Sequence, residues 1–278
     1  MRHVLAPRRF IAILVLSLIA IRPALPGEKV YVGSKGTPAK RVAMDQIDHS
    51  NWDALLRRYV DPDGKVDYKR WKANAADRRT LHQYLAQLST ADPTLKSAKA
   101  AKLAFWINAY NSVTIAGILQ QYPTSSIRNH TARLFGYNIW HDLLLTVGGR
   151  PYSLDEIEHQ VLRKMGEPRI HFAIVCAAKG CPRLLAEAYT TEQLDNQLEV
   201  NAKDFFARRT HFRFDAARGS FQLSSILKWF GSDFGANDKA MLKRIAAFLP
   251  TQQSRKAAAK GQGSVSYLDY DWDLNDQR

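Results

Sequence analysis

The stretch SAKAAKLAFWINAYNSVTIAGILQQ (97–121) is the most apolar segment of the chain after residue 27. Its length and alanine content favour a helix over a strand. The helix should end at Tyr122-Pro123, because proline disfavours the helical conformation of the residue before it. The stretch therefore predicts a central buried helix.

The chain on the N-terminal side of this stretch also has helical patterning. HSNWDALLRRYV (49–60) and TLHQYLAQL (80–88) are amphipathic segments. Pro62 and Gly64 supply turn chemistry between them. The N-terminal half of the chain is therefore predicted to be helical.

The chain on the C-terminal side mixes hairpins with helices. Gly148-Gly149 in LLLTVGGRPYSL indicates a β-hairpin, and Ser153 with Glu156 forms a capping box at the start of the next helix. The remaining predictions are a strand at 169–176, a helix at 190–208, a hairpin at 210–225, two short helices at 225–249 and a strand at 264–272.

This order of elements predicts an α+β fold, with a helical N-terminal half and a central buried helix packed on a mostly antiparallel sheet. The chain has 278 residues, 46% of them hydrophobic, and shows no repeat and no long linker. That length can bury one full core. We therefore expect a single domain over residues 47–278.

The N-terminus has the pattern of a secretory signal. Arg2, Arg8 and Arg9 precede an apolar run at 10–21, which is short for a membrane span. Residues 1–27 are therefore expected to be a signal peptide or an uncleaved N-terminal anchor, followed by a lead-in arm at 28–46. The expected location is exported, either periplasmic or extracellular.

The charge balance indicates which partners the chain could bind. Its formal net charge is +14, which favours anionic surfaces such as a component of the cell envelope. Basic residues are scattered without an aromatic-interleaved stripe, so we expect no nucleic-acid partner. Membrane contact is expected only through an uncleaved N-terminal segment. The sequence predicts no cofactor and no metal.

Asn108 and Asn111 are the first candidate site residues. Their i, i+3 spacing puts both amides on one face of the 97–121 helix. A buried amide without hydrogen-bond partners costs about 1–3 kcal/mol. The pair could therefore tie the helix to a neighbouring backbone segment, or one amide could orient a histidine or line an oxyanion site.

The second candidate is HFAIVCAAKGCP (171–182), which holds both cysteines of the chain, Cys176 and Cys181. A cysteine nucleophile needs a base within hydrogen-bond reach. On a regular strand His171 and Cys176 would face opposite sides, so His141 is the better-placed base. Ordinary packing, a nucleophile, a disulfide and a metal site with His171 all stay open. Lys179 would lower the pKa of a neighbouring thiol.

Other charged groups are expected to be peripheral. In YLDYDWDLN (267–275) the acids Asp269, Asp271 and Asp273 would share the wet face of an edge strand, from which one could orient a histidine. Glu158 and its helix neighbours Glu156 and Arg163 are interpreted as surface or salt-bridging groups. His159 and His211 are further histidines that could serve Cys176.

Six segments in this order resemble the exported bacterial members of the domain-of-unknown-function 547 family, from about Asp67 to Asn275. They are AFWINAYNSVTI, YSLDEIEHQVLR, PRIHFAIVCAAKGCPRL, AYTTEQLDNQL, FQLSSILKWFGSDFG and YLDYDWDLN. Many members of that family have serine in place of Ala178, and some have asparagine in place of Val175. Their activity is unestablished, and plant relatives join the domain to coiled coils, so the resemblance implies an interaction role as readily as catalysis.

The order of a buried helix and antiparallel strands is similar to papain-like and transglutaminase-like folds. Those folds place the cysteine on the helix, where this chain has Asn108 and Asn111, so the fold alone does not imply hydrolysis. The first functional hypothesis is a thiol-dependent hydrolase or acyltransferase, with Cys176 as nucleophile, His171 or His141 as base and Asn108 or Asn111 as orienting group. The alternative is a non-catalytic binding module with a cleft beside the 97–121 helix.

Overall fold

The computed structural model describes residues 29–36, 38–132 and 137–277. The expected signal segment at 1–27 lies outside them. The helices are α1 (Ser50–Tyr59), α2 (Tyr68–Ala73), α3 (Ala75–Leu88), α4 (Lys99–Gln121), α5 (Ile139–Asp142), α6 (Leu154–Glu156), α7 (Leu194–Ala207), α8 (Ser225–Phe234), α9 (Asp238–Ile245) and α10 (Gln252–Lys260). The strands are β1 (Val30–Val32), β2 (Leu143–Val147), β3 (Arg150–Ser153), β4 (Phe212–Asp215), β5 (Ser220–Ser224) and β6 (Ser264–Leu268). The α+β fold class is thus confirmed.

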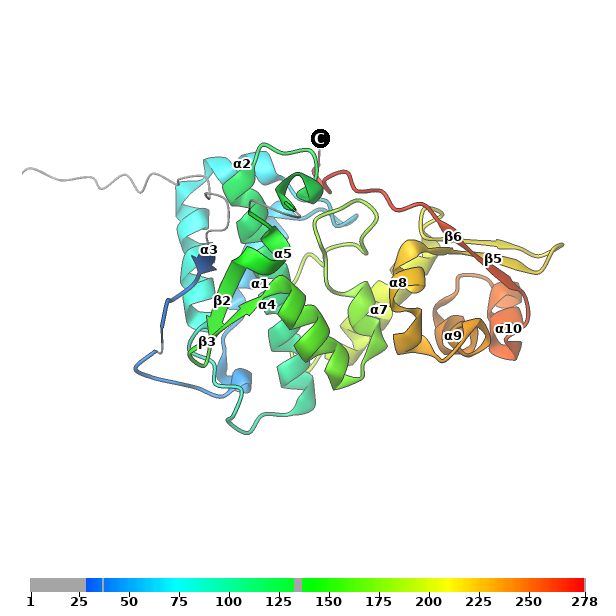
Figure 1. Cartoon of the computed structure of the whole chain (residues 1–278), viewed down its shortest axis with the longest axis horizontal. Helices are drawn as coiled ribbons and strands as arrows, with labels where there is room; N and C mark the ends of the chain where they lie inside the picture. The colour runs from blue at the N-terminus through cyan, green and yellow to red at the C-terminus, as the bar shows by residue number, and fades with distance from the viewer. Residues whose placement is uncertain (1–28, 37, 133–136, 278) are drawn as a thin grey trace, which may run out of the picture.

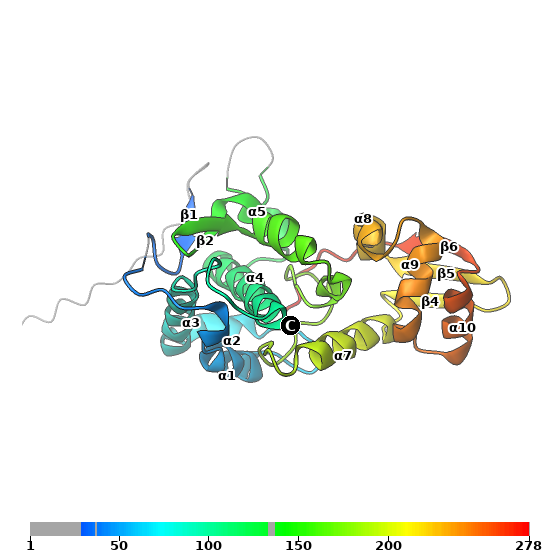
Figure 2. The same ribbon diagram turned by 90° about the horizontal axis from the view of Figure 1, so that it is seen from below.

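The described chain forms two lobes (Figures 1 and 2). The large lobe contains α1–α6 and β1–β3, and the small lobe contains α8–α10 and β4–β6. Helix α7 runs from one lobe towards the other, and the segment after β6 returns to the large lobe. Each lobe has its own apolar cluster, one centred on α4 and one rich in phenylalanine from α7, β4 and β5.

Helix α4 is the buried centre of the large lobe, as its sequence predicts. Almost every side chain from Leu103 to Leu119 is buried, which is expected of a helix that is apolar all round. At Gly117 an added Cβ would lie 2.6 Å from a side-chain carbon of Leu143. Glycine at this position therefore lets β2 approach the helix.

The strands form two small sheets of similar design. In the order β1-β2-β3, β2 and β3 are an antiparallel hairpin and β1 is a parallel neighbour. In the order β4-β5-β6, β4 and β5 are the hairpin and β6 is the parallel neighbour. Both hairpins were predicted, whereas β1 lies in the segment expected to be a lead-in arm.

The predicted strand at 169–176 is wrong. Pro168–Phe172 is a short 3₁₀-helix capped by the Glu167 side chain, and an irregular segment follows. The backbone there is hydrogen-bonded by buried amides rather than by a strand: Asn201 donates to the carbonyl of Phe172, and Asn111 bonds the carbonyl of Ala173. Tertiary hydrogen bonds therefore override the β propensity of this segment.

The C-terminal strand is shorter than predicted. It ends at Leu268, and the chain then runs along the turn at 177–180. The N–H of Lys179 donates to the carbonyl of Asp273 and the N–H of Gly180 to that of Asp271, both at 2.8 Å. Asp269, Asp271 and Asp273 therefore do not share a strand face, and the prediction that they do is wrong.

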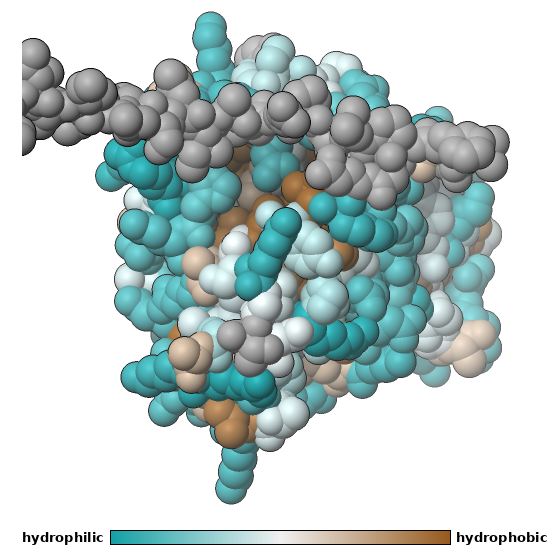
Figure 3. All heavy atoms as spheres, turned by 60° about the vertical axis from the view of Figure 1, so that its left-hand side comes forward, coloured by the Kyte–Doolittle hydropathy of each residue, from teal (hydrophilic) through white to brown (hydrophobic). Residues whose placement is uncertain are grey.

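The surface is largely polar on one side of the molecule. Where its atoms are described, the face in Figure 3 is mostly hydrophilic, with apolar residues in scattered patches. Within the described ranges, no helix combines the length and apolar character needed to cross a membrane.

Candidate functional site

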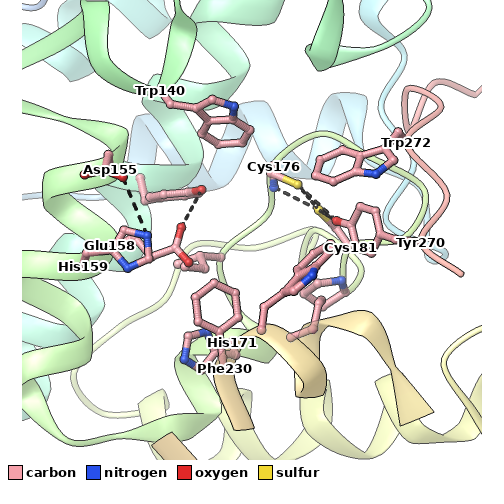
Figure 4. Close-up of a pocket in the computed structure, with 15 residues that line it drawn as sticks. Trp140, Asp155, Glu158, His159, His171, Cys176, Cys181, Phe230, Tyr270 and Trp272 are labelled. Atoms are coloured by element: carbon pink, nitrogen blue, oxygen red, sulfur yellow. Dashed lines mark hydrogen bonds and ion pairs between the residues drawn. The ribbon is translucent and has the colours of Figure 1, made fainter. Parts of the chain in front are cut away.

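A cavity of about 190 Å³ lies where the two lobes meet (Figure 4). Helix α4, the α5–α6 region and the 171–182 segment form one side of it, and α8 and the chain after β6 form the other. The lining residues are Tyr110, Trp140, Asp155, Glu158, His159, His171, Ile174, Cys176, Cys181, Pro182, Ile226, Trp229, Phe230, Tyr270 and Trp272.

Both cysteines lie on the wall of this cavity as free thiols. Their sulfur atoms are 2.7 Å apart, whereas a disulfide bond measures about 2.05 Å. The backbone N–H of Cys176 donates to Cys181 Sγ at 3.1 Å, and the Tyr270 hydroxyl lies 3.0 Å from the same sulfur. Cys181 Sγ therefore has three hydrogen-bond partners around it: an amide that donates to it, a thiol and a phenol.

The loop between the cysteines is held in an uncommon conformation. Ala177 has φ +60°, a left-handed value that residues with a Cβ seldom adopt. At Gly180 an added Cβ would lie 2.9 Å from ring atoms of Tyr270. The absence of a side chain at Gly180 thus allows Tyr270 to reach both sulfurs.

The two thiols differ in acidity. Burial opposes ionisation of Cys181, but hydrogen bonds from Cys176 and Tyr270 outweigh burial and lower its pKa. The hydrogen bond to Cys181 raises the pKa of Cys176 well above its usual range, and burial adds to this. Cys181 is therefore the thiol that ionises more readily, whereas the sequence interpretation assigned the nucleophile to Cys176.

Asn108 and Asn111 tie α4 to other backbone segments. Asn108 bonds both the N–H and the carbonyl of Tyr189 at 3.0 and 2.8 Å. Asn111 donates to the Ala173 carbonyl and accepts from the Val175 N–H at 3.0 and 2.9 Å. Both amides are thus engaged by backbone groups, which is the structural role weighed from the sequence, and neither lines the cavity.

His171 is oriented away from the thiols. Its Nε2 lies 2.8 Å from Asp233 Oδ2, and its ring stacks on Phe230 with centroids 4.2 Å apart. Burial lowers its pKa to about 4. The dyad of His171 with Cys176 is therefore not formed, and the reason is the bond to Asp233 rather than the alternation of a strand.

The other histidines do not complete a dyad either. His141 is exposed on α5 and outside the cavity lining, while its neighbour Trp140 lines the cavity. His159 lines the cavity but bonds Arg163 at 3.1 Å, and His211 is buried against Phe205. Among the described residues, none of these rings makes a hydrogen bond to either sulfur.

Glu158 is the titratable residue of the cavity that the sequence interpretation missed. Its carboxylate accepts a hydrogen bond from the Tyr110 hydroxyl at 3.2 Å. Although its surface is only partly buried, closely packed atoms raise its pKa to about 7. It lies on a π-helical stretch, Ile157–Leu162, across the cavity from the thiols (Figure 4). Such stretches often mark functional sites, but the amphipathic sequence pattern does not reveal them.

Aromatic side chains form much of the wall. Trp229 packs on Tyr270 and Trp272, with ring centroids 4.9 and 5.8 Å apart. Its 46% exposure is high for a tryptophan, so its ring lies where the cavity meets solvent. An apolar or aromatic ligand group would fit beside it.

The metal hypothesis for His171, Cys176 and Cys181 finds no geometric support. Within the described ranges no group of three or more His, Cys, Asp or Glu side chains is arranged to hold a metal ion. Lys179 does not approach the thiols as expected, since it pairs with Asp273 at 3.1 Å.

The cysteine segment and helix α4, which bonds it through Asn111, lie in one stretch of the chain that matches a family model. Residues 94–206 match the family model described as "Protein of unknown function, DUF547". The match covers 113 of the 278 residues, so this part of the chain is similar to the family. It includes α4, Glu158 and both cysteines, but ends before α8 and Tyr270. No curated protein and no solved structure matches the chain.

Proposed function

We propose that this protein catalyses thiol-dependent acyl transfer or hydrolysis, with Cys181 as the nucleophile. The observation that carries the proposal is the set of three hydrogen-bond partners around Cys181 Sγ on the wall of an aromatic cavity. A thiolate stabilised by hydrogen bonds needs no adjacent base for its activation. That no histidine of the described ranges bonds either sulfur is therefore compatible with this chemistry.

The reaction would proceed in two steps. The Cys181 thiolate attacks the carbonyl carbon of an ester or amide, and a thioester forms as the leaving oxygen or nitrogen departs with a proton from Glu158. Water or an acceptor hydroxyl or amine then attacks the thioester, returns a proton to Glu158 and releases the thiolate. A carboxyl with its pKa near 7 can serve in both directions at neutral pH.

The substrate would combine an ester or amide with an apolar group. Trp140, Trp229 and Trp272 suit an acyl chain or an aromatic ring, and the cavity volume suits a small one. The basic balance of the chain and its signal-like N-terminus support an anionic component of the cell envelope as the source of the substrate, and an exported location.

The first prediction tests the nucleophile. Purified protein mixed with p-nitrophenyl butyrate should release a burst of p-nitrophenolate, and intact-mass analysis should find one butyryl group on Cys181. Cys181→Ala should lower the burst rate by about 10³-fold or more. Acylation located on Cys176 instead, or no burst at any pH between about 6 and 9, would contradict the proposal.

The alternative function is a non-catalytic binding module. It is favoured by one observation, the exposed Trp229 within the aromatic wall. In that case an aromatic ester would quench tryptophan fluorescence saturably without being cleaved, and Trp229→Ala would weaken the binding. The ester experiment thus separates the two functions.

A further inference from the structure

The chain has two cysteines, and the fold brings both sulfurs into contact on one cavity wall. Acyl transfer needs only one of them. The second thiol is not a packing residue alone, because Cys176 is partly exposed and points its sulfur at the first. The arrangement of a donor thiol beside a stabilised thiolate suits a reaction in which both sulfurs take part.

We propose that Cys181 and Cys176 act as a dithiol pair that reduces a disulfide carrying an aromatic or apolar group, and that the pair closes into a disulfide in doing so. This activity rests on the same cavity as the proposed function but uses its second cysteine. The substrate class is a small organic disulfide that the aromatic wall can hold.

The reaction is a two-step exchange. The Cys181 thiolate attacks one sulfur of the substrate, the substrate S–S bond breaks, and one substrate thiolate leaves. Cys176 then gives its proton to the first substrate thiolate and attacks Cys181 Sγ of the mixed disulfide, which expels the second substrate thiolate and forms the Cys176–Cys181 bond. Two electrons pass from the protein to the substrate, and an external dithiol such as dithiothreitol returns the pair to its reduced form.

Three features of the site support the order of these steps. The backbone N–H that donates to Cys181 Sγ and the nearby Tyr270 hydroxyl favour a thiolate at this sulfur, and thiolates are the attacking species in exchange. The contact with Cys181 Sγ at 2.7 Å raises the pKa of Cys176, which suits the thiol that reacts second. The sulfurs already lie 2.7 Å apart, so closure requires little movement of the loop.

The loop geometry also favours formation of the Cys176–Cys181 disulfide, because it keeps a substrate bonded to Cys181 close to Cys176. Asn111 holds the Ala173 carbonyl and the Val175 N–H just before Cys176. The C-terminal segment holds the N–H groups of Lys179 and Gly180 just before Cys181. Both cysteines are therefore fixed from outside the loop, and a substrate bonded to Cys181 would remain within reach of Cys176.

The second prediction uses 5,5′-dithiobis(2-nitrobenzoate), an aromatic disulfide, on the reduced wild-type protein. Each chain should release two equivalents of thionitrobenzoate, and the protein should lose two hydrogens in intact mass while retaining no adduct. Dithiothreitol should restore the original mass. Because the chain contains no other cysteine, Cys176→Ser/Cys181→Ser is a complete blank.

The variants test the roles of the two sulfurs. Cys176→Ser should release one equivalent and retain one adduct on Cys181, since the resolving thiol is gone. Cys181→Ser should react at least about 10-fold more slowly, because Cys176 lacks the stabilised thiolate. If either variant fails to fold, the intact mass of the wild-type protein after the reaction still tests the proposal. Two retained adducts, or no reaction, would overturn the dithiol activity.

The dithiol activity and the acyl-transfer proposal can fail separately. Disulfide closure without an ester burst would overturn acyl transfer alone. An ester burst together with two retained thionitrobenzoate adducts would overturn the dithiol activity alone.

Discussion

At the scale of single residues, Glu158 couples the cavity to pH. In the folded protein the Glu158 carboxyl keeps its proton up to about pH 7, because burial raises its pKa from 4.5 to about 7. The unfolded chain releases that proton near its ordinary pKa. Between these values the folded state binds more protons, so stability is lost as pH rises through this window.

The third prediction is that Glu158→Gln removes this loss of stability with rising pH. The neutral amide keeps a hydrogen-bond acceptor for Tyr110 without the buried charge. Near pH 8 the variant should be more stable than the wild type by about 1–2 kcal/mol, after allowing for the partial solvent access of the site, and near pH 5 the two should be similar. Urea titrations at several pH values measure this. Parallel pH profiles for the two proteins would contradict it.

At the scale of elements, the predictable parts are those set by local patterns. Three such predictions are confirmed. They are the helix from the apolar run of α4, the hairpin from the glycine pair between β2 and β3, and the Ser153–Glu156 capping box. These features depend on residues a few positions apart, which is why a single sequence reveals them.

The site was less predictable because distant residues decide it. The segment 169–176 has strand-like composition, but its backbone bonds to Asn111 on α4 and Asn201 on α7. The pKa values of both cysteines are lowered by the hydroxyl of Tyr270, which follows Cys181 by 89 positions. The spacing of residues within a short segment does not reveal a contact between residues so far apart in the sequence. The sequence therefore indicated the cysteine segment, but it did not reveal the hydrogen bonds to Cys181 Sγ or the position of Glu158 in the cavity.

The fourth prediction compares the two asparagines of α4. Asn111→Ala and Asn108→Ala each leave two buried backbone groups without partners, so each should destabilise the protein by about 2–4 kcal/mol. Asn111→Ala should in addition slow disulfide closure, because the Asn111 amide fixes the segment before Cys176. Thermal unfolding measures the first effect and stopped-flow thiol release the second. Equal closure rates in the two variants would refute this role of Asn111.

At the scale of the whole molecule, a charged cluster joins the lobes beside the cavity. Asp233 on α8 accepts two hydrogen bonds from Arg163, each at 2.7 Å, and faces His171 of the large lobe. The hydrogen bond from Arg163 lowers the pKa of Asp233 to about 2. The stability that Asp233 contributes is thus present above about pH 4 and is lost as pH falls towards 2.

The fifth prediction is that Asp233→Asn destabilises the protein at pH 7 by about 2 kcal/mol, because it leaves Arg163 without its carboxylate partner. The matched control is Asp195→Asn. That carboxylate is 83% exposed and pairs with Arg169 on the surface, so its loss should cost less than about 1 kcal/mol. Calorimetric unfolding of both variants measures the difference, and equal losses would show that the cluster does not hold the lobes together.

The late position of Tyr270 also has a consequence for biosynthesis. During translation Cys176 and Cys181 leave the ribosome well before the segment that carries the phenol, 89 positions after the second cysteine. Because domains begin to fold while the chain is still being made, the part of the large lobe already synthesised exists for a time with its sulfurs still lacking the Tyr270 hydroxyl. The newly made thiols therefore acquire their final acidity only when the last part of the chain has been synthesised.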